Sequence, residues 1–139
     1  VYAGDNAAFS LPFVNLGLCP EAGSSLLLPQ LMGHQRAAEA LLLGEPFTAE
    51  TALELGLINR IVPPAEANAL AQMQAKKLAA KPLSSLLETK RLMKMSNAPV
   101  VAGRIAEEIS SFGRMLREPA AREAFTAFVE KRRPDFAKL

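Results

Sequence analysis

The chain has 139 residues, enough for one domain that buries about two thirds of its unfolded surface. Half of the residues are hydrophobic and 22% are charged, as in ordinary globular proteins, and the net charge of +2 argues against nucleic acid as a partner. No apolar run approaches the roughly 20 residues of a membrane-spanning helix. The single cysteine excludes an internal disulfide and fits a reducing compartment.

The first dozen residues are β-compatible and rich in turn residues, which predicts the end of one strand and then a second short extended piece. Because the chain opens directly on such a segment, we expect it to begin inside a fold. The pattern becomes helical after Pro20, with Glu21 in the first turn, where a carboxylate suits the helix dipole. Pro29 is expected to limit or kink this helix. A compact helix is predicted between Gly33 and Gly44.

A second short helix is predicted with Thr48 as its N-cap and Gly56 just after its end. Residues 57–63 alternate apolar and polar positions around β-branched residues, and they form the clearest predicted strand. Helices are then predicted over residues 64–80 and from residue 82 to about residue 95.

The last part of the chain is predicted to be helical, after a break at residues 97–99. A final helix is expected over residues 120–131, preceded by a helix with an apolar stripe. The stripe consists of Val101, Ile105, Ile109, Phe112 and Leu116. The few predicted strands cannot form a sheet with its own core. We therefore expect this chain to be the helical, C-terminal portion of a larger fold.

The chain has too few histidines and aspartates for several common kinds of catalytic site. His34 is the only histidine, and Asp5 and Asp135 are the only aspartates, which disfavours a Ser-His-Asp triad and a metal site. His34 is interpreted as a surface residue at a helix start, and Cys19 as a small packed residue.

Glu21 is a lone carboxylate in an apolar stretch, because the nearest acidic residues in the sequence are Asp5 and Glu39. One interpretation is a solvated first-turn residue that offsets the helix dipole. The other is a catalytic base held in an apolar pocket. Composition and spacing leave both interpretations open.

The C-terminal residues carry a basic cluster, Lys131–Arg133, followed by Lys138. Such a cluster is either a solvated terminus or a contact for phosphate, and Phe125 and Phe128 could offer a flat surface to an adenine ring. The final residues, Ala137–Leu139, are similar to a peroxisomal address of the Ser-Lys-Leu type.

A set of motifs occurs in a fixed order along the chain: Tyr2–Ala3, Pro12–Gly17, Pro20–Gly23, Gly33–Ala37, "LLGEPFTAETALELGLINRIVP" and "FVEKRRPDF". In this order they resemble the crotonase, or enoyl-CoA hydratase/isomerase, superfamily. The resemblance implies an α/β crotonase-like (ClpP/crotonase) fold, of which this chain would be the mostly α-helical C-terminal half with a few short strands.

The resemblance also implies a division of roles. Residues 1–63 would be the end of the core with the active-site helix, and residues 64–139 the helical part that binds CoA and forms trimers. The family's oxyanion hole would lie in the missing N-terminal half and not in this chain. We therefore expect the 139-residue segment alone to be inactive.

The stretch Pro20–Ser25 is similar to the peroxisomal-type Δ3-Δ2-enoyl-CoA isomerases, in which this glutamate transfers the proton. Hydratases of the family carry a second catalytic glutamate after the earlier proline, where this chain has Phe13. The resemblance therefore implies an isomerase with Glu21 as the base and with Phe13 and Leu18 binding the substrate. Other acyl-CoA chemistry (dehalogenation or hydration) and a non-catalytic CoA-binding interaction module are the alternatives.

Partners and location follow from the same resemblance. Phe128 and Lys131 would contact the adenine nucleotide end of coenzyme A, often across a subunit boundary of a homotrimer or hexamer. Coenzyme A belongs to the substrate, so no separate cofactor, metal, nucleic acid or membrane is expected. A cytoplasmic, bacterial location is expected, with a peroxisomal one as the alternative.

Overall fold

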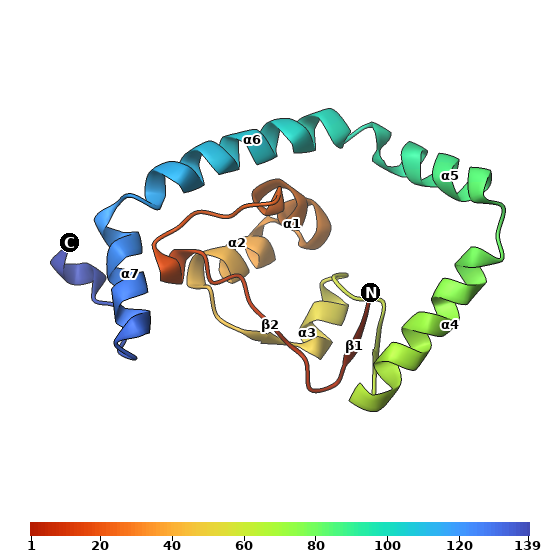
Figure 1. Cartoon of the computed structure of the whole chain (residues 1–139), viewed down its shortest axis with the longest axis horizontal. Helices are drawn as coiled ribbons and strands as arrows, with labels where there is room; N and C mark the ends of the chain where they lie inside the picture. The colour runs from red at the N-terminus through yellow and green to blue at the C-terminus, as the bar shows by residue number, and fades with distance from the viewer. The chain divides into compact units, whose positions relative to one another are not determined.

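The computed structural model describes all 139 residues and contains seven α-helices and four short strands (Figure 1). The chain forms two compact units. Unit 1 comprises residues 1–9 and 47–100, and unit 2 comprises residues 10–46 and 101–139. None of the helices combines the length and the apolar character needed to cross a membrane. The predicted functional division at residue 63 stays a prediction.

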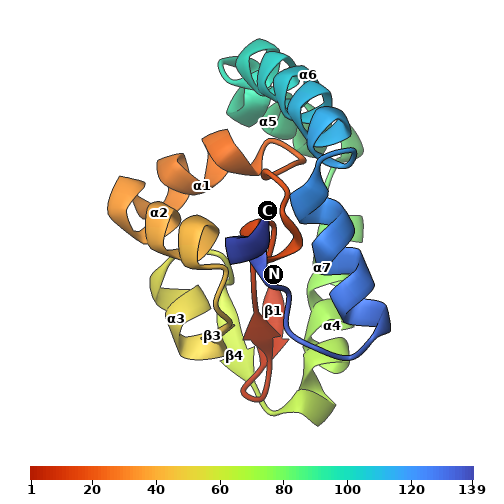
Figure 2. The ribbon, with the colours of Figure 1, turned by 90° about the vertical axis from the view of Figure 1, so that its left-hand side faces the viewer.

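Two small sheets organise unit 1. Strand β1 (Tyr2–Gly4) pairs in parallel with β4 (Arg60–Val62), as Figure 2 shows, and β2 (Ala8–Phe9) pairs antiparallel with β3 (Phe47–Thr48). The two predicted N-terminal extended pieces and the strand predicted within residues 57–63 are therefore confirmed.

The core of unit 1 is built mainly from small side chains. Ala3, Ala49, Ala52 and Ile58 form its buried cluster. Against this cluster pack several larger, partly buried residues, among them Phe9 and Phe47, whose rings stack with centroids 5.8 Å apart. This contact ties β2 to β3 through their side chains as well as their backbones.

Helix α3 (Ala49–Glu54) has the caps that the sequence predicts. The Thr48 hydroxyl accepts a hydrogen bond from the Thr51 amide at 3.4 Å. Gly56 follows the helix with a φ of +75°, a left-handed value that glycine adopts without strain.

The rest of unit 1 is helical, as predicted. A short 3₁₀ turn, η2 (Pro64–Glu66), leads into α4 (Ala67–Ala79), which packs against β1. Helix α5 (Leu83–Met95) follows and is exposed along almost its whole length. The predicted break falls at Ser96 and Asn97, after which α6 (Ala98–Met115) begins.

Unit 2 contains the helical pair α1 (Ser24–Met32) and α2 (His34–Leu43), which lie side by side (Figure 1). The helix between Gly33 and Gly44 is confirmed as α2, and the exposed position predicted for His34 is also confirmed. Pro29 does not end α1, which continues to Met32.

The predicted start of α1 is wrong. The helix begins at Ser24 and not near Pro20. The reason lies in the two residues before Ser24: Ala22 has a φ of +59° and Gly23 a φ of +77°. An α-helix requires negative φ at every residue, so Glu21 lies outside the helix in a turn.

The C-terminal part of unit 2 contains the later residues of α6, helix α7 (Pro119–Val129) and a terminal 3₁₀ turn, η3 (Phe136–Lys138). Helix α7 buries three alanines, Ala121, Ala124 and Ala127. It packs against the 3₁₀ turn η1 (Val14–Leu16), and η1 is also held to the end of α2, because the Asn15 side-chain amide donates to the Gly44 carbonyl at 2.9 Å.

Gly17, which follows η1, lies close to the backbone of α7. A Cβ atom at this position would lie 2.6 Å from the carbonyl carbon of Ala120 and 2.7 Å from the Ala121 nitrogen. Gly17 also has a φ of +67°. Both the backbone conformation and the contact with α7 therefore require glycine.

We expect Gly17→Ala to lower the free energy of unfolding by about 2 to 5 kcal/mol, since left-handed strain costs about 1–2 kcal/mol and overpacking about 1–3 kcal/mol. Gly23→Ala is the matched control: Gly23 is also left-handed, but a Cβ there would meet only side-chain atoms at 3.4 to 3.5 Å. It should lose only about 1–2 kcal/mol. Urea denaturation of the full protein measures both losses, and equal losses would contradict the close packing at Gly17.

Candidate functional site

Glu21 is the first residue of a tight turn that leads into α1. Its carbonyl accepts hydrogen bonds from the Ser24 amide at 3.0 Å and from the Ser24 hydroxyl at 2.6 Å. The two central residues, Ala22 and Gly23, both have positive φ, as in turns of type I′. An alanine in the left-handed region costs about 1–2 kcal/mol, so neighbouring contacts must hold this turn in place.

Those contacts come from Glu108, a buried glutamate of α6 that is only 5% exposed. One carboxylate oxygen accepts the Gly23 amide at 2.6 Å. The other accepts the Ser25 amide at 3.0 Å and the Ser25 hydroxyl at 2.5 Å. Helix α1 has no cap from its own N-cap side chain, so Glu108 supplies the acceptor that its first amides need.

The turn has two further contacts with α6. The Arg104 guanidinium donates to the Ser25 hydroxyl oxygen at 3.3 Å. On the other side of Glu21, the Cys19 thiol lies 3.9 Å from the backbone carbonyl of Glu108, within the range of a weak sulfur hydrogen bond. Residues before and after Glu21 are therefore bound to the same residue of α6.

The surroundings of Glu108 keep it ionised. Burial raises the pKa of its carboxyl, but the hydrogen bonds from Ser25 and Gly23, together with Arg104, outweigh burial and leave the pKa below its ordinary value. An ionised carboxylate accepts hydrogen bonds and donates none. Burial also raises the pKa of the Cys19 thiol, so this cysteine stays protonated near neutral pH.

The structure groups three of the predicted site residues on one short segment. Leu18 is buried, and its amide donates to the carbonyl of the half-buried Phe13 at 2.9 Å. Glu21 follows three residues later with an exposed side chain. The residues of this chain leave Glu21 open to solvent, so an apolar pocket around it stays a prediction.

The predicted CoA-binding pair lies elsewhere in unit 2, at the end of α7. Phe128 is 80% exposed, and its carbonyl accepts the Lys131 amide at 3.2 Å. Helix α7 meets η1 at Ala120, and Phe128 lies about 12 Å further along the helix at 1.5 Å per residue. The structure therefore places Phe128 and Lys131 close to each other, at the end of α7 away from η1.

A second carboxylate, Glu123, holds the residues after α7. It forms an ion pair with Arg132 at 2.5 Å and accepts the Asp135 amide at 2.8 Å. The hydrogen bond from Arg132 and that from the Asp135 amide lower the pKa of Glu123 to about 2. Lys131, the residue next to Arg132, has a φ of +54°. The Glu123–Arg132 pair thus fixes the backbone that presents Lys131.

We expect the Glu123 carboxyl to titrate near pH 2 in the folded protein, which pH-dependent NMR of the full protein measures. Because the folded pKa lies below the ordinary value of 4.5, the stabilisation from Glu123 is fully present above about pH 4.5 and is lost as the pH falls toward 2. Glu123→Gln should remove this dependence, whereas Glu39→Gln on α2 should not. A normal titration of Glu123 near pH 4.5 would contradict the ion pair.

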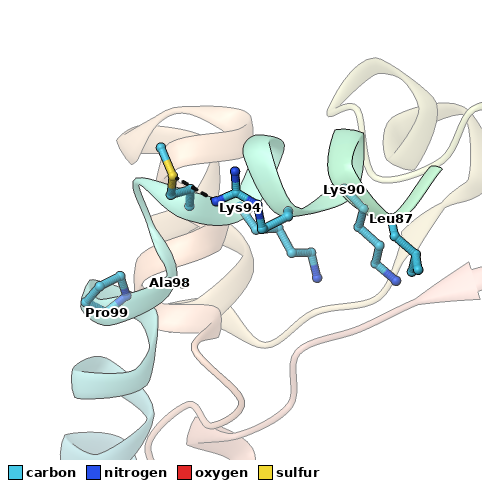
Figure 3. Close-up of a pocket in the computed structure, with 7 residues that line it drawn as sticks. Leu87, Lys90, Lys94, Ala98 and Pro99 are labelled. Atoms are coloured by element: carbon cyan, nitrogen blue, oxygen red, sulfur yellow. Dashed lines mark hydrogen bonds between the residues drawn. The ribbon is translucent and has the colours of Figure 1, made fainter. Parts of the chain in front are cut away.

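A separate pocket lies in unit 1, where the last turns of α5 meet the start of α6 (Figure 3). It is shallow and open, with a volume of about 460 Å³. Its lining residues combine apolar and basic side chains: Leu87, Lys90, Arg91, Lys94, Met95, Ala98 and Pro99. None of the predicted site residues belongs to it.

Glu108 is the site residue that the sequence interpretation misses. The signal for it is its place on the predicted apolar stripe, three residues after Ile105 and four before Phe112. A carboxylate on the buried face of an amphipathic helix requires partners, and here the partners are the first amides of α1.

Comparisons with known proteins extend over almost the whole chain. A family model described as "Enoyl-CoA hydratase/isomerase" matches residues 1–138. A solved enoyl-CoA hydratase/isomerase from Pseudoalteromonas atlantica is 35% identical with a TM-score of 0.92, covering 98% of this chain and 55% of that one. OdaA of Pseudomonas aeruginosa is 43% identical with a TM-score of 0.89, covering 92% and 52%. The predicted crotonase-like fold is therefore confirmed.

Two curated relatives differ in their names. The 2,3-dehydroadipyl-CoA hydratase of Escherichia coli is 32% identical over 136 residues, which are 98% of this chain and 53% of that protein. Enoyl-CoA delta isomerase 2 of Rattus norvegicus is 38% identical over 94 residues, which are 68% of this chain and 24% of that protein. The chain thus spans about half the length of the hydratase it matches.

Proposed function

We propose, because this chain belongs to the enoyl-CoA hydratase/isomerase family, that the protein is an acyl-CoA isomerase. It would shift a double bond of an enoyl-CoA from the 3,4 to the 2,3 position, with Glu21 as the group that moves the proton. The observation that carries this proposal is the single free carboxylate on the turn before α1.

The contacts of Glu108 support a one-carboxylate mechanism. Hydration by a pair of carboxylates needs a second group that exchanges protons with water or substrate. Glu108 is the other carboxylate bound to the Glu21 turn, but it is buried, ionised and occupied by Gly23 and Ser25. Phe13 occupies the position at which the resemblance expects the second acid of hydratases. Glu21 alone is therefore free to act in this segment.

Isomerisation needs only one such group. Glu21 would remove a proton from the carbon between the thioester carbonyl and the 3,4 double bond. The electrons of the broken C–H bond would delocalise into a dienolate, with negative charge on the thioester oxygen. Glu21 would then return the proton to the γ carbon, which leaves the double bond at the 2,3 position and restores the carboxylate.

The dienolate needs hydrogen-bond donors that point at the thioester oxygen, and such donors usually contribute the largest part of the rate enhancement. The relatives are about twice as long as this chain. We place these donors in the part of the protein outside residues 1–139.

The exposed end of α7 supports a role in binding the CoA portion of the substrate. Phe128 offers an apolar ring to adenine, and Lys131 offers an ammonium group to a phosphate. Because the family resemblance implies that such residues act across a subunit boundary, we propose that they serve a neighbouring subunit of a homotrimer or hexamer. CoA enters as part of the substrate, and we propose no separate cofactor.

Hydration of a 2-enoyl-CoA is the second candidate. It is supported by the name of the Escherichia coli relative and by that of a short-chain-enoyl-CoA hydratase of Clostridium acetobutylicum, which is 29% identical over 131 residues. The rat isomerase supports the first candidate over the residues that it matches.

We expect the full protein to isomerise 3-enoyl-CoA faster than it hydrates 2-enoyl-CoA of the same chain length. Glu21→Gln should lower the isomerisation rate by about 10²–10⁴-fold, the usual contribution of a positioned base. Glu39→Gln, which changes another exposed glutamate, should leave the rate unchanged. Both rates can be followed by chromatography of the CoA esters. Hydration faster than isomerisation would contradict the isomerase assignment.

Lys131→Ala should raise the KM for the CoA ester about 2- to 5-fold and leave kcat unchanged, because an exposed charge contact is worth up to about 1 kcal/mol and binds ground and transition states alike. Lys76→Ala on the exposed face of α4 is the control. A fall in kcat at constant KM would show that Lys131 does not act by binding phosphate.

A further inference from the structure

We propose that Glu108 is a positioning residue for catalysis: its carboxylate holds the Glu21–Ser24 turn in the one conformation that aims the Glu21 side chain at the substrate. This inference rests on the proposed function of Glu21. It assigns to a buried residue on α6 a part in the reaction that neither composition nor motif indicates.

The first step of the argument is the conformation of the turn. Ala22 holds a left-handed conformation, which is unfavourable for a residue with a Cβ atom. The turn would relax to a more favourable conformation if nothing held it. Since Glu21 is the first residue of this turn, such a relaxation would redirect its side chain.

The second step is the arrangement of the bonds that prevent relaxation. The Glu108 carboxylate binds Gly23 and Ser25 after the turn, and the Glu108 carbonyl accepts from the Cys19 thiol before it. Glu21 is thus held from both sides by one residue that is 85 positions away from Gly23 in the sequence. These bonds tie the turn to α6 on both sides of Glu21.

The third step is the chemistry of the carboxylate. Three donors converge on its two oxygens, so both oxygens are needed as acceptors. A glutamine would replace one oxygen with an NH₂ group, which would face an amide donor of Gly23 or Ser25. Glu108→Gln keeps the size of the side chain and removes only one of the two acceptor oxygens.

The test measures isomerisation by the full protein with matched variants. Glu108→Gln should lower kcat about 10- to 100-fold with KM changed less than 2-fold, because misplacing a reacting group by about 1 Å costs up to about 10²-fold. Glu107→Gln, the exposed neighbour on α6, should leave both constants unchanged. Ser25→Ala removes one of the three donors and should lower kcat about 3- to 10-fold.

Two further measurements separate positioning from stability. The kcat of each variant is expressed per folded molecule, with the folded fraction taken from near-UV circular dichroism. The double variant Glu21→Gln/Glu108→Gln should be no slower than Glu21→Gln alone, because Glu108 acts only through Glu21. If Glu108→Gln does not fold, Ser25→Ala and its double variant with Glu21→Gln decide the question.

The outcomes are distinct. If Glu21→Gln abolishes isomerisation while Glu108→Gln and Ser25→Ala keep the wild-type kcat per folded molecule, Glu108 only stabilises the fold and the inference is overturned. A further large loss in the double variant would also overturn it. If Glu21→Gln keeps full activity, the proposed function itself fails, and with it the role given to Glu108.

Discussion

The buried carboxylate of Glu108 is the interaction on which the geometry of the candidate site depends. A charge that is 5% exposed is unfavourable in a protein interior unless hydrogen bonds replace its water. Here the replacement comes from the Gly23 amide just before α1 and from the amide and hydroxyl of Ser25, the second residue of the helix. Amides at the start of a helix have no acceptor within the helix. The carboxylate and these donors therefore complete each other's hydrogen bonding, and their hydrogen bonds hold the turn that bears Glu21 in its conformation.

The same principle operates at the other end of unit 2. Glu123 on α7 receives the Arg132 guanidinium and the Asp135 amide, so that the residues after the helix fold back on it. In both places a glutamate on a helix accepts hydrogen bonds from another segment: Glu108 from the turn and the start of α1, and Glu123 from the residues after α7. The apolar contacts of unit 2 pack its helices, and these two carboxylates set the backbone of the segments that bear Glu21 and Lys131.

The sequence predicted the elements whose ends carry local signals. Gly33 and Gly44 bound α2, and Thr48 caps α3, because these residues favour helix ends by their own conformations. The start of α1 could not be predicted in this way. Alanine has no preference for the left-handed conformation that Ala22 adopts, and the contacts that impose it come from α6, 85 residues beyond Gly23. Glu21 was found by resemblance, whereas Glu108 needed the structure.

The alanines buried on α7 have a consequence for the variation that this fold tolerates. Ala121, Ala124 and Ala127 are each exposed by 4% or less, and Gly17 lies directly against the first of their turns. Substitution by a smaller residue, which usually destabilises a core, removes very little at an alanine or a glycine. Substitution by a larger residue is what would destabilise the packing at these positions. Substitutions on the buried face of this helix are therefore limited by the maximum side-chain size that fits. These small residues tolerate less change than larger core residues would.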